Sequence, residues 1–244
     1  MRLNKQIENL DYAETKRFFE KRAGKYNSER PYTVTMYQDN NPELVRKRNK
    51  EELEKLYPML HIDSRSTVLD VACGIGRWAD ALETNVAEYC GIDFSEGLIE
   101  LAKKRNKKEF AEFYCGSIVD IGNVLKENKK GKYNVILMLG ILMYLNDNDL
   151  QSVLTQIENA CEQNVVICIR EPIALQERLT LKNFYSDELK DDYNAIYRTR
   201  EEVKDFLDKT LLDKGFRVRE EDFLFPNELN NRKETSQYYF ILER

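Results

Sequence analysis

A glycine-rich turn follows the first strongly apolar run of the chain. Residues 68–76 read VLDVACGIG, and the helical pattern that follows opens at Arg77. Glycine lets the backbone approach a ligand closely, and a helix N-terminus offers N–H groups that have no partner within the helix. The pattern therefore predicts a ligand-binding turn between a strand and a helix. Gly74-x-Gly76-x-x-Ala79 on its own also matches a dinucleotide fingerprint, and a tight structural turn would show the same glycines.

An acidic residue ends the next apolar run. Residues 89–95 read YCGIDFS, which places Asp93 23 residues after Asp70. A carboxylate at the end of a second strand can accept hydrogen bonds from both hydroxyls of a bound ribose, and Phe94 could cover a purine face. Asp93 could instead cap the following helix, but Ser95 already suits that role. The two runs together predict a nucleoside-binding site.

Alternating strands and helices must position these residues. Apolar runs lie at 67–72, 87–92, 110–114, 133–139 and 165–169. Helical stretches fall near 77–84, 96–108, 118–127 and 147–161. This alternation predicts an α/β domain with a parallel sheet and helices on both faces.

The end of the chain breaks the alternation. Thr199 and Glu202 match a capping box for a helix that runs to about Asp213 and ends at Gly215. Two strand-like runs at 216–225 and 237–242 have no helix between them, which predicts antiparallel neighbours.

Two other segments stand outside the alternation. Apolar spacing predicts one helix around Ile7, Leu10 and Phe18, and a second over 44–60. We expect residues 1–60 to form a helical cap or lid on a core of residues 61–244. Within that core, residues 172–199 show no clear period, and we expect a polar, aromatic insertion that covers the substrate.

The motifs resemble those of a known enzyme family. Asp70-x-Ala72-x-Gly74-x-Gly76 followed by Gly91-Ile92-Asp93 is similar to motifs I and II of class I S-adenosylmethionine-dependent methyltransferases. The resemblance implies an α/β fold with a Rossmann-like seven-stranded mixed sheet, helices on both faces and a closing antiparallel β-hairpin. It also implies S-adenosyl-L-methionine as cofactor and S-adenosyl-L-homocysteine as product.

The same resemblance assigns roles to residues of this chain. Gly74 and Gly76 would flank the methionine half, Asp93 would hold the ribose, and Asp70 would support the loop and the methionine ammonium. Ser117 stands where the third motif usually has an acid, and Asn134 where an acid is common in the fourth. The cofactor-binding residues implied are Asp70, Ala72, Gly74, Gly76, Asp93, Phe94, Ser117, Ile118, Leu139 and Gly140.

Composition limits the classes of partner. The net charge is −5, which argues against nucleic acid because phosphate binding needs a basic face. One histidine and no CxxC pair argue against a zinc site. We expect no metal, no membrane span and a cytoplasmic protein with free thiols, of which Cys73, Cys90, Cys115 and Cys168 read as core residues. A small-molecule substrate is the expected partner.

A group of tyrosines and arginines is expected to bind the methyl acceptor. Substrate-binding candidates are Tyr32, Tyr37, Tyr144, Arg170, Tyr185, Tyr197 and Arg198. Arginine forks suit phosphate and carboxylate oxygens. The only histidine, His61, precedes the first strand and is expected at the wrong end of the sheet to act as a base. This favours an acceptor that is already ionised, of the phosphonate, phosphoramidate or carboxylate type.

Other functions stay open at this point. Residues 197–202 and 234–237 resemble bacterial small-molecule O-methyltransferases that act on surface-polysaccharide sugars or on phosphonate oxygens. A sugar hydroxyl would need a base, for which Glu171 and Asp147 are the catalytic candidates beside Arg170. An NAD-dependent oxidoreductase and a non-catalytic cofactor-binding module are further alternatives.

The motif analysis makes one direct prediction. Asp93→Ala removes charge-assisted hydrogen bonds to the ribose and should weaken binding of S-adenosylmethionine by roughly 1.5–3 kcal/mol. Isothermal titration of the folded variant measures the loss. An unchanged affinity would remove Asp93 from the cofactor site.

Overall fold

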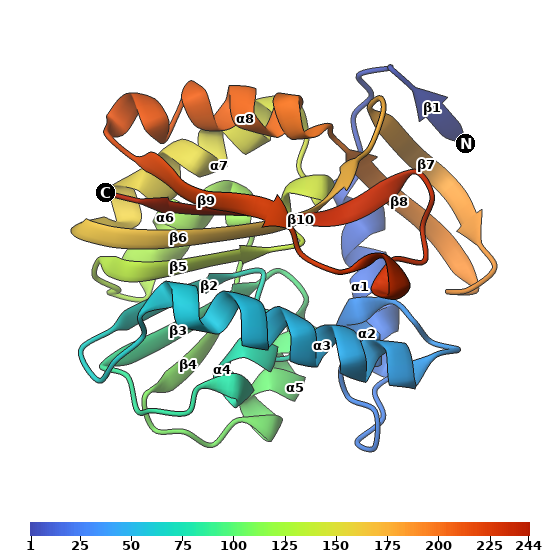
Figure 1. The fold of residues 1–244 in the computed structure, drawn as a ribbon. Coiled ribbons are helices and arrows are strands. Elements are labelled where there is room, and N and C mark those ends of the chain that lie inside the picture. Colours follow the sequence, from blue (N-terminus) through green and yellow to red (C-terminus); the bar gives the residue numbers. More distant parts are fainter.

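Seven strands form the main sheet of the computed structural model, which describes residues 1–244 (Figure 1). Its strands are β2 (Thr67–Val71), β3 (Glu88–Asp93), β4 (Ala111–Cys115), β5 (Tyr133–Leu139), β6 (Cys161–Ala174), β9 (Arg217–Phe223) and β10 (Thr235–Glu243). The spatial order is β4-β3-β2-β5-β6-β10-β9, and β10 pairs antiparallel with both β6 and β9. The predicted seven-stranded mixed sheet with its closing hairpin is therefore confirmed.

The main sheet separates two hydrophobic clusters. Along β2, Leu69 and Val71 belong to one cluster and Val68 to the other, and β5 and β10 alternate in the same way. Side chains on a strand point to opposite faces in turn, so apolar residues at every position bury both faces. This explains why the central strands read as continuous apolar runs in the sequence.

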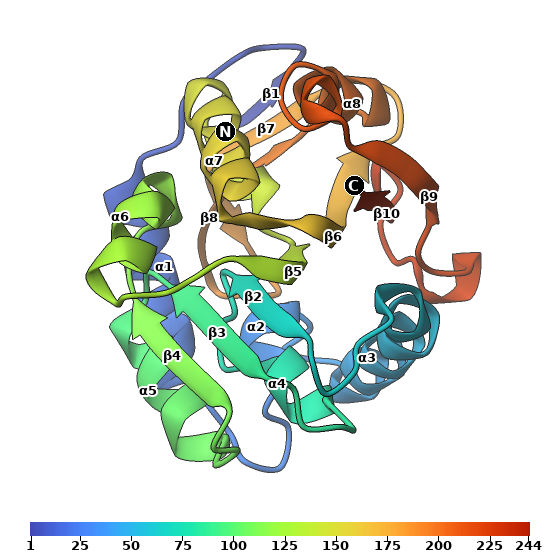
Figure 2. The ribbon, with the colours of Figure 1, turned by 90° about the vertical axis from the view of Figure 1, so that its left-hand side faces the viewer.

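Eight α-helices accompany the strands. They are α1 (Tyr12–Gly24), α2 (Thr33–Met36), α3 (Pro42–Leu56), α4 (Arg77–Ala81), α5 (Glu96–Arg105), α6 (Ile121–Glu127), α7 (Asp147–Ala160) and α8 (Arg200–Asp208). Figure 2 shows α3 and α4 on one side of the sheet, with α6 and α7 on the other. None of these helices is both long and apolar enough to cross a membrane.

Local capping sets two of the helix boundaries. The Ser95 side chain accepts a hydrogen bond from the Leu98 N–H at 3.2 Å and so opens α5. The predicted capping box of Thr199 and Glu202 is present at the start of α8. That helix ends at Asp208, earlier than expected, and a short 3₁₀ turn leads to Gly215, whose φ is +87°.

A second, three-stranded sheet replaces the irregular insertion expected at 172–199. β7 (Leu179–Ser186) and β8 (Asp191–Tyr197) form an antiparallel hairpin, and β1 (Arg2–Asn4) pairs with β7. The sequence showed no period because buried residues here do not alternate regularly with exposed ones: residues 179–181 and 193–196 are continuous buried runs that include the polar Thr180 and Asn194. Figure 1 shows this sheet beyond the ends of β5 and β6.

The first 60 residues are neither wholly helical nor separate from the core. β1 is a strand, Ile7 is 73% exposed, and α1 begins only at Tyr12. Phe18 and Phe19 belong to the larger cluster, and Leu56 to the smaller one. The action of this segment as a lid stays a prediction.

Burial of the cysteines differs from the expectation at two positions. Cys73, Cys90 and Cys168 are buried as expected. Cys115 is exposed because it is the last residue of the edge strand β4, whereas Cys161 is buried where α7 meets β6.

The edge strand β9 is strongly charged. Its sequence is RVREEDF, and β10 is its only neighbour in the sheet. Arg217 and Arg219 both pair with Glu243 of β10, at 2.6 and 3.0 Å. The edge of the main sheet formed by β9 is therefore lined by charges.

Packing of the N-terminal segment gives a stability prediction. Leu56 is fully buried, so Leu56→Ala should lower the free energy of unfolding by about 2–5 kcal/mol. Ile7→Ala is the matched control, since an exposed substitution should stay within about 0.5 kcal/mol. Urea denaturation followed by circular dichroism measures both. Equal stability of the two variants would mean that α3 is not part of the cooperative fold.

Candidate functional site

The site lies at the carboxyl end of β2, where the chain connections from neighbouring strands of the main sheet lead to opposite sides. β2 lies between β3 and β5, and all three are parallel. In such sheets the loops at the carboxyl ends of these strands part and leave a crevice. The loop after β2 turns through residues with positive φ, Ala72 at +63°, Gly74 at +58° and Gly76 at +75°.

Gly74 brings the N-terminal segment into contact with this loop. A Cβ atom on Gly74 would lie 2.8 Å from Cγ2 of Thr35, so a side chain there would clash with the Thr35 side chain of α2. Gly76 faces the protein interior instead, where a Cβ would lie 3.0 Å from the ring of Phe113.

A cavity follows the glycine turn, and we name it the glycine-loop cavity. It holds about 760 Å³ of empty space, counting space open to solvent. The predicted residues that line it are Ala72, Gly74, Asp93, Phe94, Ser117, Ile118, Leu139 and Gly140. Eight of the residues implied by the motifs thus meet around one space.

Asp93 supplies a buried carboxylate to this cavity. Its Oδ2 accepts a hydrogen bond from the Gly74 N–H at 2.9 Å, and its Oδ1 accepts one from the Ser95 N–H at 3.0 Å. Burial raises the pKa of Asp93 to about 6. A carboxylate has about four acceptor positions, so two remain for hydroxyl groups of a ligand. This carboxylate and the glycine cradle fit a ligand that carries a ribose.

Two implied cofactor residues do not line the cavity. Asp70 is 3% exposed and accepts a hydrogen bond from the Tyr89 hydroxyl, and burial raises its pKa to about 6. It joins β2 to β3 beneath the loop, so its direct contact with a methionine ammonium is not supported. Gly76 shapes the turn and packs on Phe113.

Several residues of the glycine-loop cavity escaped the sequence analysis. They are Tyr12, Thr15, Phe19, Thr35, Leu98, Val119 and Leu145. Four of them come from α1 and α2, and only the fold shows which side of those helices faces the crevice. Tyr37 and Tyr144, assigned to the acceptor, also line this cavity.

A second cavity opens beside the first, and we name it the arginine cavity. It encloses about 1410 Å³, counting space open to solvent, and shares Thr35, Tyr37, Leu139 and Gly140 with the glycine-loop cavity. Its charged lining residues are Arg2, Arg48, Glu52, Arg170, Arg232, Lys233 and Glu234. Cations outnumber carboxylates there, although the chain as a whole is acidic.

One buried carboxylate is shared by two arginines of this region. Glu52 of α3 is 1% exposed, and its Oε2 lies 3.2 Å from Nε of Arg170. Arg77 also pairs with Glu52, and the indole of Trp78 donates to it at 3.1 Å. Although burial alone would raise it, Arg170 and Arg77 hold the pKa of Glu52 below its ordinary value. One negative charge thus serves two guanidinium groups.

Three tyrosine hydroxyls lie at the boundary of the two cavities. The Tyr144 hydroxyl donates to the Tyr37 hydroxyl at 3.2 Å and lies 2.9 Å from the hydroxyl of Tyr193. Burial raises the pKa of each tyrosine above its ordinary value. These hydroxyls are therefore neutral hydrogen-bonding groups at physiological pH.

The predicted substrate residues fall into two groups. Tyr37, Arg170 and Tyr197 line the arginine cavity, whereas Tyr144 lines only the glycine-loop cavity. Tyr32, Tyr185 and Arg198 line neither cavity. Tyr32 donates to Asp80 at 3.2 Å, Tyr185 is 55% exposed, and Arg198 donates to the Leu142 carbonyl at 2.7 Å.

The two carboxylates considered as bases are also outside both cavities. Glu171 accepts hydrogen bonds from the N–H groups of Ile141, Leu142 and Met143, at 2.6, 2.8 and 3.2 Å. Asp147 pairs with Arg178 at 2.8 Å and with Arg198 at 2.6 Å. Both carboxylates hold backbone or arginine groups in place, which corrects their expected position at the acceptor.

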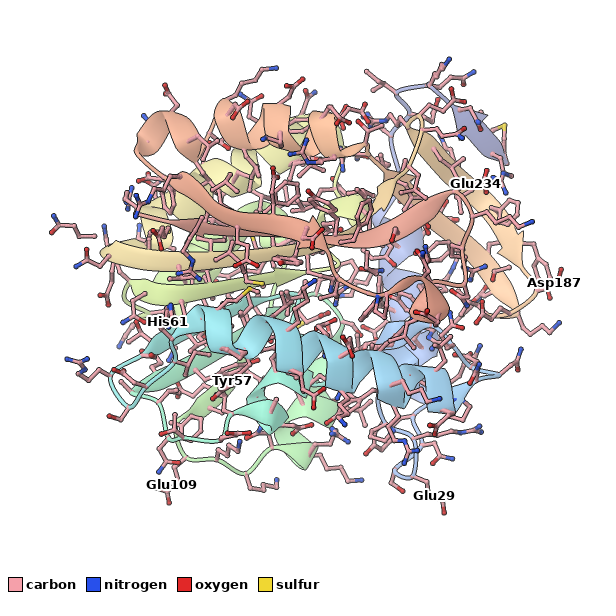
Figure 3. The ribbon with its side chains drawn as sticks, viewed as in Figure 1. Glu29, Tyr57, His61, Glu109, Asp187 and Glu234 are labelled. Atoms are coloured by element: carbon pink, nitrogen blue, oxygen red, sulfur yellow. The ribbon has the colours of Figure 1, made fainter.

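The single histidine lies at the far end of the sheet, as expected. His61 ends the turn before β2, and Figure 3 shows it at the opposite end of the molecule from Glu234, which borders the arginine cavity. His61 is therefore far from the acceptor region.

Comparison with known proteins identifies one family. A family model described as a methyltransferase domain matches residues 62–215. Phosphoethanolamine N-methyltransferase 1 of Triticum aestivum is 24% identical over 125 residues, which cover 50% of this chain. The match covers only 24% of the wheat enzyme, so this chain spans a small part of that relative.

Solved structures share the fold at low sequence identity. Phosphoethanolamine N-methyltransferase 1 of Haemonchus contortus, in complex with phosphoethanolamine and S-adenosylhomocysteine, gives a TM-score of 0.68 at 15% identity, covering 96% of this chain and 50% of that one. DhpI in complex with S-adenosylhomocysteine (SAH) gives 0.63 at 14% identity, covering 93% of each chain. Both neighbours hold the product form of the expected cofactor.

The raised pKa of Asp93 predicts pH-dependent ligand binding. The carboxylate is lost as the pH falls through about 6, and with it the charge that accepts ligand hydroxyls. Between pH 7.5 and 5 the affinity for S-adenosylhomocysteine should fall by about tenfold. Isothermal titration across this range measures it. Asp93→Asn should bind more weakly and show a flat profile; the same slope in both proteins would assign the titration to another group.

Proposed function

This chain belongs to the methyltransferase domain family, and on that premise we propose that it moves a methyl group from S-adenosylmethionine to an ionised oxygen of a small anionic metabolite. The acceptor is of the phosphonate, phosphoramidate or carboxylate type. The observation that carries this proposal is Arg170, a nearly buried cation without a carboxylate of its own at the boundary of the two cavities.

The glycine-loop cavity supplies the cofactor site of this proposal. When bound, S-adenosylmethionine provides a methyl group on a positively charged sulfur. Asp93 accepts hydrogen bonds from the ribose hydroxyls, and Gly74 leaves room for the backbone to approach the ligand. Leu139 and Gly140 line both cavities, so they mark the passage between cofactor and acceptor.

Arg170 supports an anionic acceptor through its position and its charge. Its side chain is 12% exposed, and its Nε has no well-aligned hydrogen-bond acceptor. Glu52 is shared with Arg77, so part of the positive charge is left for a ligand. A Cβ on Gly140 would lie 2.9 Å from Nη1 of Arg170, which places the guanidinium at the passage. A guanidinium binds such oxygens through two parallel hydrogen bonds.

The absence of a base near the passage favours an oxygen that has no proton to lose. Glu52 lines the arginine cavity, but its lowered pKa makes it a weak proton acceptor. The nearby tyrosines are neutral hydrogen-bonding groups. A sugar hydroxyl would need a base to remove its proton. For an ionised oxygen, alignment with the methyl group supplies much of the rate.

A nitrogen acceptor is a less suitable alternative. The wheat and Haemonchus relatives are phosphoethanolamine N-methyltransferases. At the passage of this chain, however, the charged form of an amine would meet Arg170, and like charges repel. The geometry therefore favours oxygen.

Substitution of Arg170 tests the acceptor site. Arg170→Gln should raise the KM for an ionised acceptor by about 10- to 100-fold, the loss expected for a charge-assisted hydrogen bond. The KM for S-adenosylmethionine should stay near its original value. Arg217→Gln, at a residue that is 79% exposed on β9, is the matched control. Because no base is required, the rate should be nearly flat from about pH 6.5 to 9.

A different outcome would point to a hydroxyl acceptor. Methylation of a neutral sugar with a rising pH limb, lost in Glu171→Gln or Asp147→Asn, would overturn the proposal. On the present geometry, Glu171→Gln should instead lower stability, because a single amide oxygen replaces two carboxylate oxygens that serve three N–H groups.

A further inference from the structure

Arg48 is a second cation of the arginine cavity that lacks a carboxylate partner. It extends from α3, is half-buried, and has no carboxylate within 4 Å. Its Nε donates to the Leu229 carbonyl at 2.8 Å, and its Nη2 donates to Oδ1 of Asn231 at 2.9 Å. No protein group accepts a hydrogen bond from its Nη1. This nitrogen is therefore available to a ligand.

Two other arginines of the cavity wall each have a carboxylate partner, and a third shares one. Arg2 pairs with Glu234, and Arg232 pairs with Glu188 at 2.6 Å. Arg170 shares Glu52 with Arg77. Burial lowers the pKa of Arg48, and the charges of Arg232 and Arg170 act in the same direction, whereas the charge of Glu188 opposes them. Arg48, the exposed Lys233 and the shared Arg170 therefore carry the positive charge of this wall that carboxylates do not fully neutralise, and of these Arg48 and Arg170 are the partly buried ones.

Arg48 is held in place by the loop between β9 and β10, which Gln38 supports in turn. Asn231, in the loop between β9 and β10, accepts from Arg48 and donates to Oε1 of Gln38 at 2.9 Å. The guanidinium lies over the ring of Phe225, with its Cζ 5.5 Å from the ring centre. A guanidinium fixed by these contacts loses little side-chain entropy when it binds an anion.

Arg48 and Arg170 belong to different parts of the wall. Arg170 lies beside Gly140 and Gln237 at the passage, whereas Arg48 lies with Phe225 and Asn231. Because the two guanidinium groups have no hydrogen-bond or ion-pair partner in common, each offers its own site to an anion. Two separate cations on one wall suit a ligand with two separate anionic groups.

We propose that Arg48 forms a second anion-binding subsite of the arginine cavity, so that the methyl acceptor carries a phosphate, phosphonate or carboxylate group in addition to the oxygen held by Arg170. This inference rests on the proposed function. It predicts that methylation at the passage removes one negative charge while the second group stays bound at Arg48. The ester at the passage then carries one negative charge less than the acceptor did, so Arg170 holds the product less strongly while the contact at Arg48 is unchanged.

Binding of phosphonates of increasing length tests the second subsite. Isothermal titration with saturating S-adenosylhomocysteine compares methylphosphonate, which has one anionic group, with phosphonoacetate, 3-phosphonopropionate and 4-phosphonobutyrate, which have two. The best of the two-group probes should bind at least about tenfold more tightly than methylphosphonate.

Two variants on α3 provide the specific test. Arg48→Gln should reduce this preference to within about threefold while the affinity for methylphosphonate stays within about twofold. Arg46→Gln is the matched control, since Arg46 is 78% exposed, pairs with Glu43 and lies two residues away on the same helix. Thermal denaturation checks that both variants fold, and Arg48→Lys should restore part of the preference.

The possible failures separate the two proposals. If methylphosphonate binds in an Arg170-dependent way but no two-group probe binds more tightly, the second subsite is wrong and the proposed function stands. If Arg48→Gln weakens all probes equally, Arg48 only supports the loop and the second subsite is wrong. If no anion binds to the wild type, both proposals fail.

Discussion

The carboxylate of Glu52 connects the parts of the molecule that form the site. It comes from α3, receives Arg77 and Trp78 from the start of α4, and lies beside Arg170 near the end of β6. A buried carboxylate is costly unless it is paired and hydrogen-bonded, and this one has three partners. Removing it would leave two buried guanidinium groups without compensation. The positions of α3, of the start of α4 after the glycine turn, and of Arg170 therefore depend on the single negative charge of Glu52.

A second buried ion fixes the segment that lies between the two cavities. Arg22 of α1 is 2% exposed, donates to the Val34 carbonyl at 3.0 Å and pairs with Asp39 at 2.6 Å. The residues it holds include Thr35, which touches the glycine turn, and Tyr37, whose φ of +54° is uncommon for a bulky residue. Strained backbone of this kind persists only where the surroundings impose it. The N-terminal segment thus supplies two of the four residues of the wall shared by the cavities, and the end of β5 with the residue that follows it supplies the other two.

The sequence predicted the features that depend on local patterns. The glycine turn, Asp93, the capping box of α8 and the alternation of strands and helices all follow from residues that are close in the chain. The mixed sheet and its closing hairpin followed from a resemblance that rests on those same motifs. Each of these features depends on the spacing of residues along the chain, and that spacing can be recognised without knowledge of the fold.

The remaining features depend on contacts between distant segments. The β7–β8 hairpin looked irregular because its buried residues are interrupted by polar ones and its partner β1 lies 175 residues away or more. Glu171 and Asp70 are acidic residues beside the site, but their carboxylates are already hydrogen-bonded. Glu171 accepts from backbone N–H groups, and Asp70 accepts from the Tyr89 hydroxyl. Glu52 and Arg22 read as ordinary charges of amphipathic helices. Only packing shows which charges are internal, and so the acceptor region was harder to predict than the cofactor turn.

The charged strand β9 has a consequence for behaviour at high protein concentration. Edge strands offer unpaired backbone groups to neighbouring molecules, and sheets can then join into larger assemblies. On β9 a neighbouring strand would have to bury charges of both signs, including Arg217, Glu220 and Glu221. The cost of removing these charges from water opposes edge-to-edge association of two molecules. The same strand that closes the fold thereby also keeps its long open edge from acting as a template for aggregation.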